Sequence, residues 1–164
     1  MNEIMENEME TEEDTQKNKY LIFTIDKEEY GIEIKYILEI ISIQKITRVP
    51  ELVDYIKGII NLRGKIIPVM DVRLRFRKMP MEYDDRTCII VVDVDGLTVG
   101  LIVDRVSEVI NIPEDQVVMP SITTKNARNK YINGIGKIGE DVRLLIECSK
   151  LLNNEDKETI KDLI

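Results

Sequence analysis

The sequence predicts an all-β protein made of two compact, related β-barrels of about five strands each. Short segments rich in Ile and Val recur along the chain, and such β-branched residues favour strands. Hairpin turns separate several of these segments, whereas few stretches have the spacing of a helix. The chain also repeats itself: residues 31–41 align with residues 100–110, and seven of the eleven positions are identical or apolar in both copies. Such self-similarity indicates a duplicated supersecondary unit.

The repeat extends to a second pair of segments, because residues 55–59 match residues 131–135. The offset between the copies is 69 residues for the first pair and 76 for the second, so the later copy has a connector seven residues longer. The 76-residue offset also matches residues 69–72 with residues 145–148. Two related subdomains therefore explain the sequence better than one continuous architecture.

Each copy starts with a predicted β-hairpin, which is followed by a third apolar segment. Asp95-Gly96 is typical of a tight hairpin turn, because glycine tolerates a positive φ. The residues between 26 and 30 supply the corresponding turn in the first copy. The segments expected as strands are residues 20–26, the strand beginning at Tyr30, residues 88–93, residues 97–103 and the segments that end near Ile43 and Ile112.

Further elements follow in each copy. Residues 50–57 are predicted to form a short helix, since proline suits the first turn of a helix and Gly58 its end. A strand is expected over residues 65–74, where Pro68 suggests an edge position or a bulge. In the second copy residues 143–147 are expected to form the final strand.

A polar linker over residues 78–85 is the expected boundary between the subdomains, although strands are free to cross between them. Beyond residue 150 the apolar residues lie on one side of a helix, and Asn153 or Asn154 is a suitable N-cap. The expected parts of the chain are an acidic disordered tail at residues 1–18, subdomain 1 at 19–80, subdomain 2 at 81–150 and a C-terminal helix at 151–164.

The net charge of -8 is concentrated near the N-terminus. Residues 1–18 hold seven acidic residues against Lys17, a balance of -6 that leaves -2 for the rest of the chain. The tail is typical of a disordered, solubilising segment. The body argues against nucleic-acid binding, which needs a clustered positive surface. Without an apolar run of about 20 residues or a signal peptide, we expect a cytoplasmic protein with no direct membrane insertion.

Residue types that usually carry catalysis or bind metals are scarce. The chain has no His, and two distant cysteines, Cys88 and Cys148, are too few for a zinc site. We expect both thiols to be buried and reduced. The glycines at 134–139 fit a dinucleotide fingerprint only formally, because the helix that should follow is missing. The remaining catalytic alternative is a carboxylate-based enzyme that uses Asp93, Asp95 or Asp104. We expect no catalytic residue, no metal and no cofactor.

The segment 37–43 is apolar on both faces, although a small barrel needs only one apolar face inward. In a strand, Leu38 and Ile40 point one way, and the other face carries Ile37, Glu39, Ile41 and Ile43. Either the outer face packs against the sister subdomain or a helix, or it is an exposed apolar strip interrupted by a carboxylate, as at a protein interface. The second copy repeats the arrangement at Val106, Glu108 and Ile110.

The segment Asn61-Leu62-Arg63-Gly64 differs from its counterpart in the second copy, Lys137-Ile138-Gly139-Glu140. The repeated fold therefore does not demand an arginine at position 63. A guanidinium next to glycine, at the approach to a strand, is placed to reach a partner carboxylate through paired hydrogen bonds. An ordinary surface arginine is the alternative.

Five segments, taken together in their order and spacing, are specific. They are Glu29-Tyr30-Gly31-Ile32, Ile56-Lys57-Gly58-Ile59-Ile60-Asn61-Leu62-Arg63-Gly64, Pro68-Val69-Met70-Asp71, Val99-Gly100-Leu101-Ile102-Val103-Asp104 and Tyr131-Ile132-Asn133-Gly134-Ile135-Gly136. In these segments the chain resembles the CheW family, the adaptors of bacterial chemotaxis arrays, over residues 19–152. The resemblance implies two SH3-like five-stranded β-barrels around a shared apolar seam.

The same resemblance implies a non-enzymatic bridge between the tips of methyl-accepting chemotaxis receptors and the regulatory domain of the histidine kinase CheA. The protein would be recruited to membrane-associated receptor arrays, and an adaptor in a non-flagellar pathway is the alternative. The residues implied for receptor binding are Ile37, Glu39, Arg63 and Val109, with Gly58 as a backbone requirement nearby. Val118 and Ile122 are implied for kinase binding.

Overall fold

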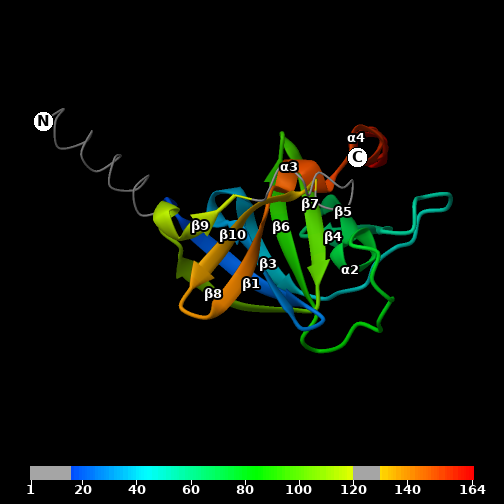
Figure 1. Cartoon of the computed structure of the whole chain (residues 1–164). Coiled ribbons are helices and arrows are strands. Elements are labelled where there is room, and N and C mark those ends of the chain that lie inside the picture. The colour runs from blue at the N-terminus through cyan, green and yellow to red at the C-terminus, as the bar shows by residue number, and fades with distance from the viewer. Residues whose placement is uncertain (1–15, 120–129) are drawn as a thin grey trace, which may run out of the picture.

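The computed structural model describes residues 16–119 and 130–164, and its strands form two sheets (Figure 1). The first sheet has the order β8-β1-β2-β11-β10-β9, with β1 (Lys19–Ile25), β2 (Glu28–Glu33), β8 (Arg105–Asn111), β9 (Val117–Val118), β10 (Ile132–Ile138) and β11 (Asp141–Ile146). The second has the order β3-β6-β7-β5-β4, with β3 (Ile37–Ser42), β4 (Ile56–Leu62), β5 (Lys65–Asp71), β6 (Cys88–Val94) and β7 (Leu97–Val103). The all-β prediction is confirmed.

The helices of the described residues are short. Two are 3-10 turns, and the others are α2, α3 and α4; their bounds are η1 (Ile34–Tyr36), η2 (Glu114–Gln116), α2 (Val72–Arg75), α3 (Cys148–Leu151) and α4 (Asn154–Leu163). Within residues 16–119 and 130–164, every helix is too short or too polar to cross a bilayer. The strands therefore determine the architecture.

The duplication is visible in the way the sheets are assembled, because each hairpin pairs with strands of the other copy. β2 runs parallel to β11, where Gly31 pairs with Leu145, and β7 runs parallel to β5, where Gly100 pairs with Val69. These two pairs occupy equivalent positions of the repeat. Strand membership thus crosses the expected boundary near residue 80: the first sheet combines β1 and β2 with β8–β11, and the second holds β3–β7.

Irregularities in the ladders recur at equivalent positions too. Between β3 and β6 the register shifts at Leu38, and between β8 and β1 it shifts at Ser107, the counterpart of Leu38. A second register shift falls at Lys57 in β4 and at Asn133 in β10. Extra residues of this kind bend a strand and increase its local twist. The bends are therefore a property of the repeated unit.

The main apolar core lies between the two sheets. Phe23 and Tyr30 from the first sheet meet buried residues of the second, such as Met70 and Leu101, and Ile160 of α4 closes the same cluster. A second cluster on the other face of the second sheet contains Ile60, Ile67, Val69, Ile89, Val91 and Ile102. Because both faces of this sheet are covered, β6 is an almost continuous apolar run rather than an alternating one.

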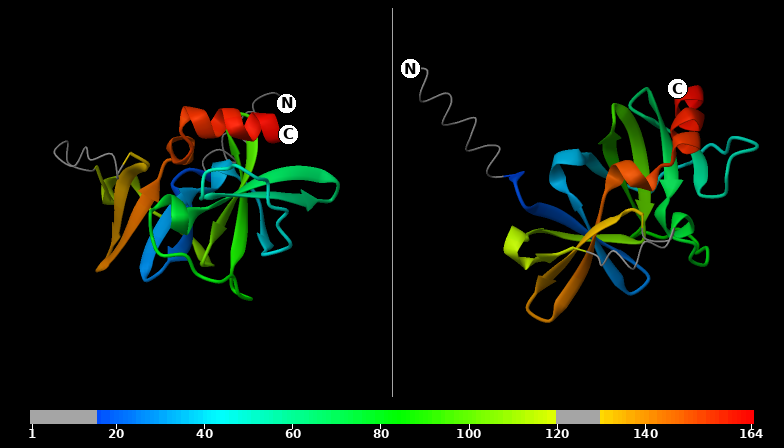
Figure 2. Two further views of the ribbon diagram at one scale, coloured as in Figure 1. Left: turned by 90° about the vertical axis from the view of Figure 1, so that its right-hand side faces the viewer. Right: turned by 45° about the horizontal axis from the view of Figure 1, so that its top comes forward.

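Two local predictions have different outcomes. The helix expected at residues 50–57 is wrong: turns occupy the segment, Glu51 has a positive φ of 66°, and β4 has already begun at Ile56. The C-terminal helix is confirmed as α4. Asn153 caps it, because its side chain accepts a hydrogen bond from the Asp156 amide and the Asp156 carboxylate accepts one from the Asn153 amide. Figure 2 shows α4 beside β7.

Candidate functional site

One edge of the second sheet is formed by β3, whose single strand neighbour among the described residues is β6. Its side chains alternate between partly buried and exposed. Ile41 packs against the second apolar cluster, whereas Leu38 and Ile40 point outward and are 57% and 44% exposed. An edge strand with unpaired backbone groups and exposed apolar side chains is suited to protein recognition.

The bulge at Leu38 breaks the strict alternation of faces expected for segment 37–43. Ile41 packs with Ile43 and Ile46 against the second apolar cluster, on the opposite face of the sheet from the main core. Ile37, predicted as a contact residue, is partly buried and packs against the main core. The exposed apolar residues are instead Leu38 and Ile40, and the repeat could have identified Ile40, because its counterpart is Val109.

Glu39 and Arg63, singled out by separate arguments, form an ion pair between Oε2 and Nη2. Glu39 belongs to β3, and Arg63 lies in the turn between β4 and β5. The Arg63 side chain is 69% exposed and that of Glu39 is 33% exposed. Exposed pairs contribute about 0–1 kcal/mol to stability. The pair therefore presents both charges at the surface without being needed for the fold.

The backbone of Arg63 is unusual for a residue with a side chain. Its φ is 51°, and the following Gly64 has a φ of 87°, so the turn from Leu62 to Lys65 needs two residues with positive φ. Asn61 accepts a hydrogen bond from the Gly64 amide at 2.8 Å. In the sister turn the position of Arg63 is occupied by Gly139, whose φ is 61°. Arg63 therefore occupies a backbone conformation that glycine adopts with less strain.

Gly58 is buried near the start of β4, five residues before Arg63, with a φ of 147°. The segment around Thr47 lies against it, since Thr47 and Ile59 exchange backbone hydrogen bonds of 2.8 Å and 2.9 Å. A Cβ atom at Gly58 would overlap the Thr47 carbonyl oxygen and lie 2.9 Å from its carbon. Gly58 thus acts through the backbone and does not reach the surface.

The other predicted contact residues are spread over the first sheet. Val109 lies on β8, the edge strand of that sheet, and is 52% exposed. Within the part of the chain that the structure describes, no hydrogen bond or ion pair joins β8 to β3. Val118 is exposed on β9, at the opposite edge of the same sheet. Ile122 lies outside the described residues.

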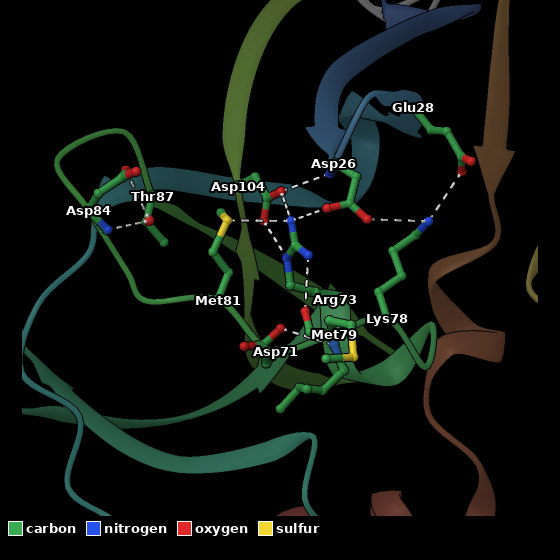
Figure 3. A network of polar contacts seen from close by, with 11 residues as sticks. Asp26, Glu28, Asp71, Arg73, Lys78, Met79, Met81, Asp84, Thr87 and Asp104 are labelled. Carbon is green, nitrogen blue, oxygen red and sulfur yellow. Dashed lines mark hydrogen bonds and ion pairs between the residues drawn. The ribbon is translucent and has the colours of Figure 1, made fainter.

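A buried arginine holds several segments together (Figure 3). Arg73 of α2 donates from Nε and Nη2 to Asp104 at 3.2 Å and 2.6 Å, and it also binds Asp26 in the turn between β1 and β2. Its Nη1 donates to the Met79 carbonyl at 3.0 Å. Bonding to the Asp104 carboxylate raises the pKa of Arg73 above its ordinary value. The cluster stabilises the fold by linking these segments. It could not be predicted from the sequence, because its residues lie far apart along the chain.

The carboxylates considered for catalysis are used elsewhere. Asp104 binds Arg73, Asp93 accepts a hydrogen bond from the Gly96 amide at 2.9 Å, and Asp95 pairs with Lys157 at 3.1 Å. They therefore do not converge on one site. Among the described residues no cluster of three or more His, Cys, Asp or Glu side chains could hold a metal ion. The features that stand out at the surface are the exposed apolar side chains of β3 and the Glu39–Arg63 ion pair beside them.

Comparison with known proteins agrees with this description. The model of the CheW-like domain family matches residues 19–156. The chemotaxis protein CheW of Klebsiella aerogenes is 34% identical over 150 residues, which cover 92% of this chain and 90% of that protein. CheW of Bacillus subtilis is 31% identical over 141 residues, covering 86% and 90%.

A solved structure leads to the same family. The crystal structure of the scaffolding protein TtCheW from Thermoanaerobacter tengcongensis superposes with a TM-score of 0.78 at 36% identity, covering 86% of this chain and 96% of that one. This agreement extends the all-β prediction to the CheW fold, with its two SH3-like subdomains. The chain belongs to the CheW family.

Proposed function

We propose that this chain couples the cytoplasmic tips of methyl-accepting chemotaxis receptors to the regulatory domain of the histidine kinase CheA. As a member of a non-catalytic family of chemotaxis adaptors, the chain is a scaffold rather than an enzyme. Its partners are the part of the function that is proposed. The observation that carries the proposal is the exposed Arg63, held at a positive φ beside Glu39 where the sister turn has glycine.

The receptor-binding surface would consist of β3 and the Arg63 turn. Leu38 and Ile40 offer apolar area, and the Glu39–Arg63 pair offers a cation and an anion that a helical partner with matching charges could bind. On binding, Arg63 would exchange its weak intramolecular pair for charge-assisted hydrogen bonds to the partner, which are about twice as strong as neutral ones. Val109 extends the surface to the first sheet only if the partner spans both edges.

The kinase-binding surface would lie elsewhere, at the edge formed by β9. This two-residue strand pairs with β10 through Val118 and Ile135, and its outer side has no strand partner among the described residues. Because β9 and β3 are edges of different sheets, one molecule could bind two proteins at once. Simultaneous binding of several modest contacts would recruit the adaptor to membrane-associated arrays through avidity.

Pull-downs with receptor-tip fragments and with the kinase regulatory domain test this division. Arg63→Ala should weaken receptor binding and leave both kinase binding and the unfolding transition unchanged, because its side chain is exposed. Arg77→Ala, at an exposed arginine that also has a positive φ and lies just beyond α2, is the matched control. If Arg63→Ala lost binding to both partners equally, or bound the receptor fragment as well as the wild type does, the assignment would be contradicted.

Charge reversal provides a second comparison at the same surface. Glu39→Lys should reduce receptor binding more than Glu39→Ala, because the lysine adds repulsion toward Arg63 and toward any cation of the partner. Similar binding by the two variants would show that the Glu39 charge takes no part in recognition.

A further inference from the structure

A hollow with a positively charged lining lies on another part of the surface, between α2, the start of β4 and the start of α4. Its volume is about 780 Å³. Four cations line it, namely Lys57, Arg75, Arg77 and Lys78, and Asp54 is the single acidic residue of the lining. Tyr55, Leu74 and Pro80 add apolar surface. We refer to this feature as the cationic hollow.

Of the four cations of the hollow, Lys78 pairs with Asp26 and Glu28, whereas the other three have no carboxylate partner among the described residues. Arg75 stacks against Tyr55 and Tyr131, with its guanidinium carbon 5.4 Å and 5.3 Å from the ring centroids, and its Nε donates to the Leu151 carbonyl at 2.6 Å. Among the described residues its two terminal nitrogens donate no hydrogen bond, and neither Lys57 nor Arg77 forms an ion pair. Donors that are held in place without acceptors are prepared for an anionic ligand.

The chain itself contains a segment with the complementary composition. The acidic N-terminal tail, residues 1–18, which we call the head from here on, carries seven carboxylates against Lys17. Between the acids stand Met1, Ile4, Met5 and Met9, so the segment combines negative charge with apolar side chains. The hollow combines cations with Tyr55, Leu74 and Pro80 in the same way. The match to the family model begins at residue 19, so the head lies outside the matched domain.

The hollow of a second molecule can bind more of the head than the hollow of the same molecule can. The head joins the fold at the start of β1, whereas Lys78 of the hollow pairs with Asp26, just beyond the end of β1 (Figures 1 and 3). A strand of this length spans about 20 Å, so the chain would use about six or seven residues to run back along it. Asp14, Glu13 and Glu12 would then lie beside β1. A neighbouring molecule could bind all seven acids.

We propose that the acidic head of one copy docks in the cationic hollow of a second copy, as a weak and salt-dependent link between adaptor molecules. Docking would place head carboxylates against Arg75, Arg77 and Lys57 and the methionines against Tyr55 and Pro80. The link is separate from the surfaces at β3 and β9, so it stands or falls independently of the receptor and kinase assignments.

Mixed-isotope cross-linking tests the proposal on the full-length chain. Equal amounts of unlabelled and ¹⁵N-labelled protein are treated with a carbodiimide, which couples carboxylates to lysines, and the linked peptides are identified by mass spectrometry. We expect head peptides joined to Lys57 or Lys78 in mixed-isotope pairs. Raising the salt from about 0.1 M to about 1 M shortens the screening length from about 10 Å to about 3 Å and should remove most of them.

Charge variants show whether the hollow is the site. Arg77→Glu should reduce the mixed pairs at least about tenfold, since like charges oppose docking, whereas Lys137→Glu, at an exposed lysine of β10, should not change them. A charge swap tests the same contact by restoring it. One variant has Glu6, Glu8 and Glu10 changed to Lys, and the other carries Lys57→Glu and Arg77→Glu. The mixture of the two variants should associate in analytical sedimentation, although neither variant does so alone.

Three results would overturn the inference. Cross-links confined to same-isotope pairs would place the head in the hollow of its own molecule. Cross-links that avoid Lys57 and Lys78, or that persist unchanged in Arg77→Glu, would place it elsewhere. A charge-swapped mixture that stays monomeric would exclude docking between molecules.

Discussion

Replacing Arg63 with glycine separates the needs of the fold from those of recognition. The sister turn already contains this substitution, because Gly139 occupies the equivalent position with a similar positive φ. Arg63→Gly should therefore preserve the turn between β4 and β5. It removes the guanidinium that pairs with Glu39 and leaves that carboxylate exposed to water.

The effect on stability follows from three opposing contributions. A side chain in the left-handed region costs roughly 1–2 kcal/mol, which glycine relieves. Glycine gives up about 0.4–1 kcal/mol through the greater freedom of the unfolded chain, and the exposed ion pair is worth about 0.2–1 kcal/mol. The sum lies within roughly 1 kcal/mol of zero, so the Tm should move by no more than about 2–4 °C for a chain of this size.

The effect on binding should be much larger. Losing charge-assisted hydrogen bonds to a partner costs about 1.5–3 kcal/mol, which corresponds to about a 10-fold to 150-fold rise in Kd. Calorimetric titration with a receptor-tip fragment, together with thermal unfolding, measures both quantities on the same sample. Gly139→Arg is the control, since nothing lies within 4 Å of a Cβ at that position and receptor affinity should not change.

Two outcomes would refute this reasoning about Arg63. If Arg63→Gly binds the receptor tip as tightly as the wild type, the exposed guanidinium has no part in recognition. If its Tm falls by more than about 8 °C, Arg63 supports the fold, and the argument from the sister turn is wrong.

Three further predictions concern the fold around the site. Gly58→Ala should lower the free energy of unfolding by at least about 3 kcal/mol in a urea titration, because its Cβ would overlap Thr47. The control Gly64→Ala has open space around its Cβ and should lose only about 1 kcal/mol. Equal losses in the two variants would contradict the close approach of Thr47. Burial raises the pKa of Cys148 to about 12. A thiol reagent at neutral pH should therefore modify the partly exposed Cys88 first and should modify Cys148 only when the protein unfolds. Rapid labelling of Cys148 in the Cys88→Ser variant would be inconsistent with the burial of Cys148. Burial and the hydrogen bond to Asp156 raise the pKa of Tyr55 from 10.0 to about 12. The contribution of Tyr55 to stability is therefore intact below pH 10 and is lost as the pH rises from about 10 to about 12. Tyr55→Phe should make the loss of stability at alkaline pH less steep, and an unchanged loss would exclude this linkage.

The duplication could be predicted from sequence, but the exchange of strands between the copies could not. Matching segments 69 or 76 residues apart identify equivalent positions and say nothing about which strands pair. The pairing depends on close approach: a Cβ at Gly31 would lie 3.0 Å from Leu145, and one at Gly100 would lie 2.9 Å from Val69. The glycines were visible in the sequence as part of the repeat, whereas their partners are set by long-range packing.

The candidate site was predicted in part for similar reasons. Period-two alternation predicted two faces for β3, but the bulge at Leu38 breaks the alternation, and the covered side chains depend on the distant clusters that Ile37 and Ile41 join. Arg63 was recognised because it breaks the repeat, and its ion pair with Glu39 joins two features that were inferred separately. The cationic hollow was missed because a run such as Arg75, Arg77 and Lys78 reads as a solvated surface until β4 and α4 enclose it.

The equivalent edge strands β3 and β8 show how one duplicated scaffold acquires different surfaces. Ile40 and Val109 are equivalent and both exposed, so each edge keeps one outward apolar side chain. The bulged position is Leu38 on one edge and Ser107 on the other, and the turn carries Arg63 in one copy and Gly139 in the other. The differences fall at bends and turns, where a side chain changes without disturbing the ladder. The two copies therefore share a framework, and the exposed side chains that distinguish them include Leu38 on β3 and Arg63 in the turn beside it.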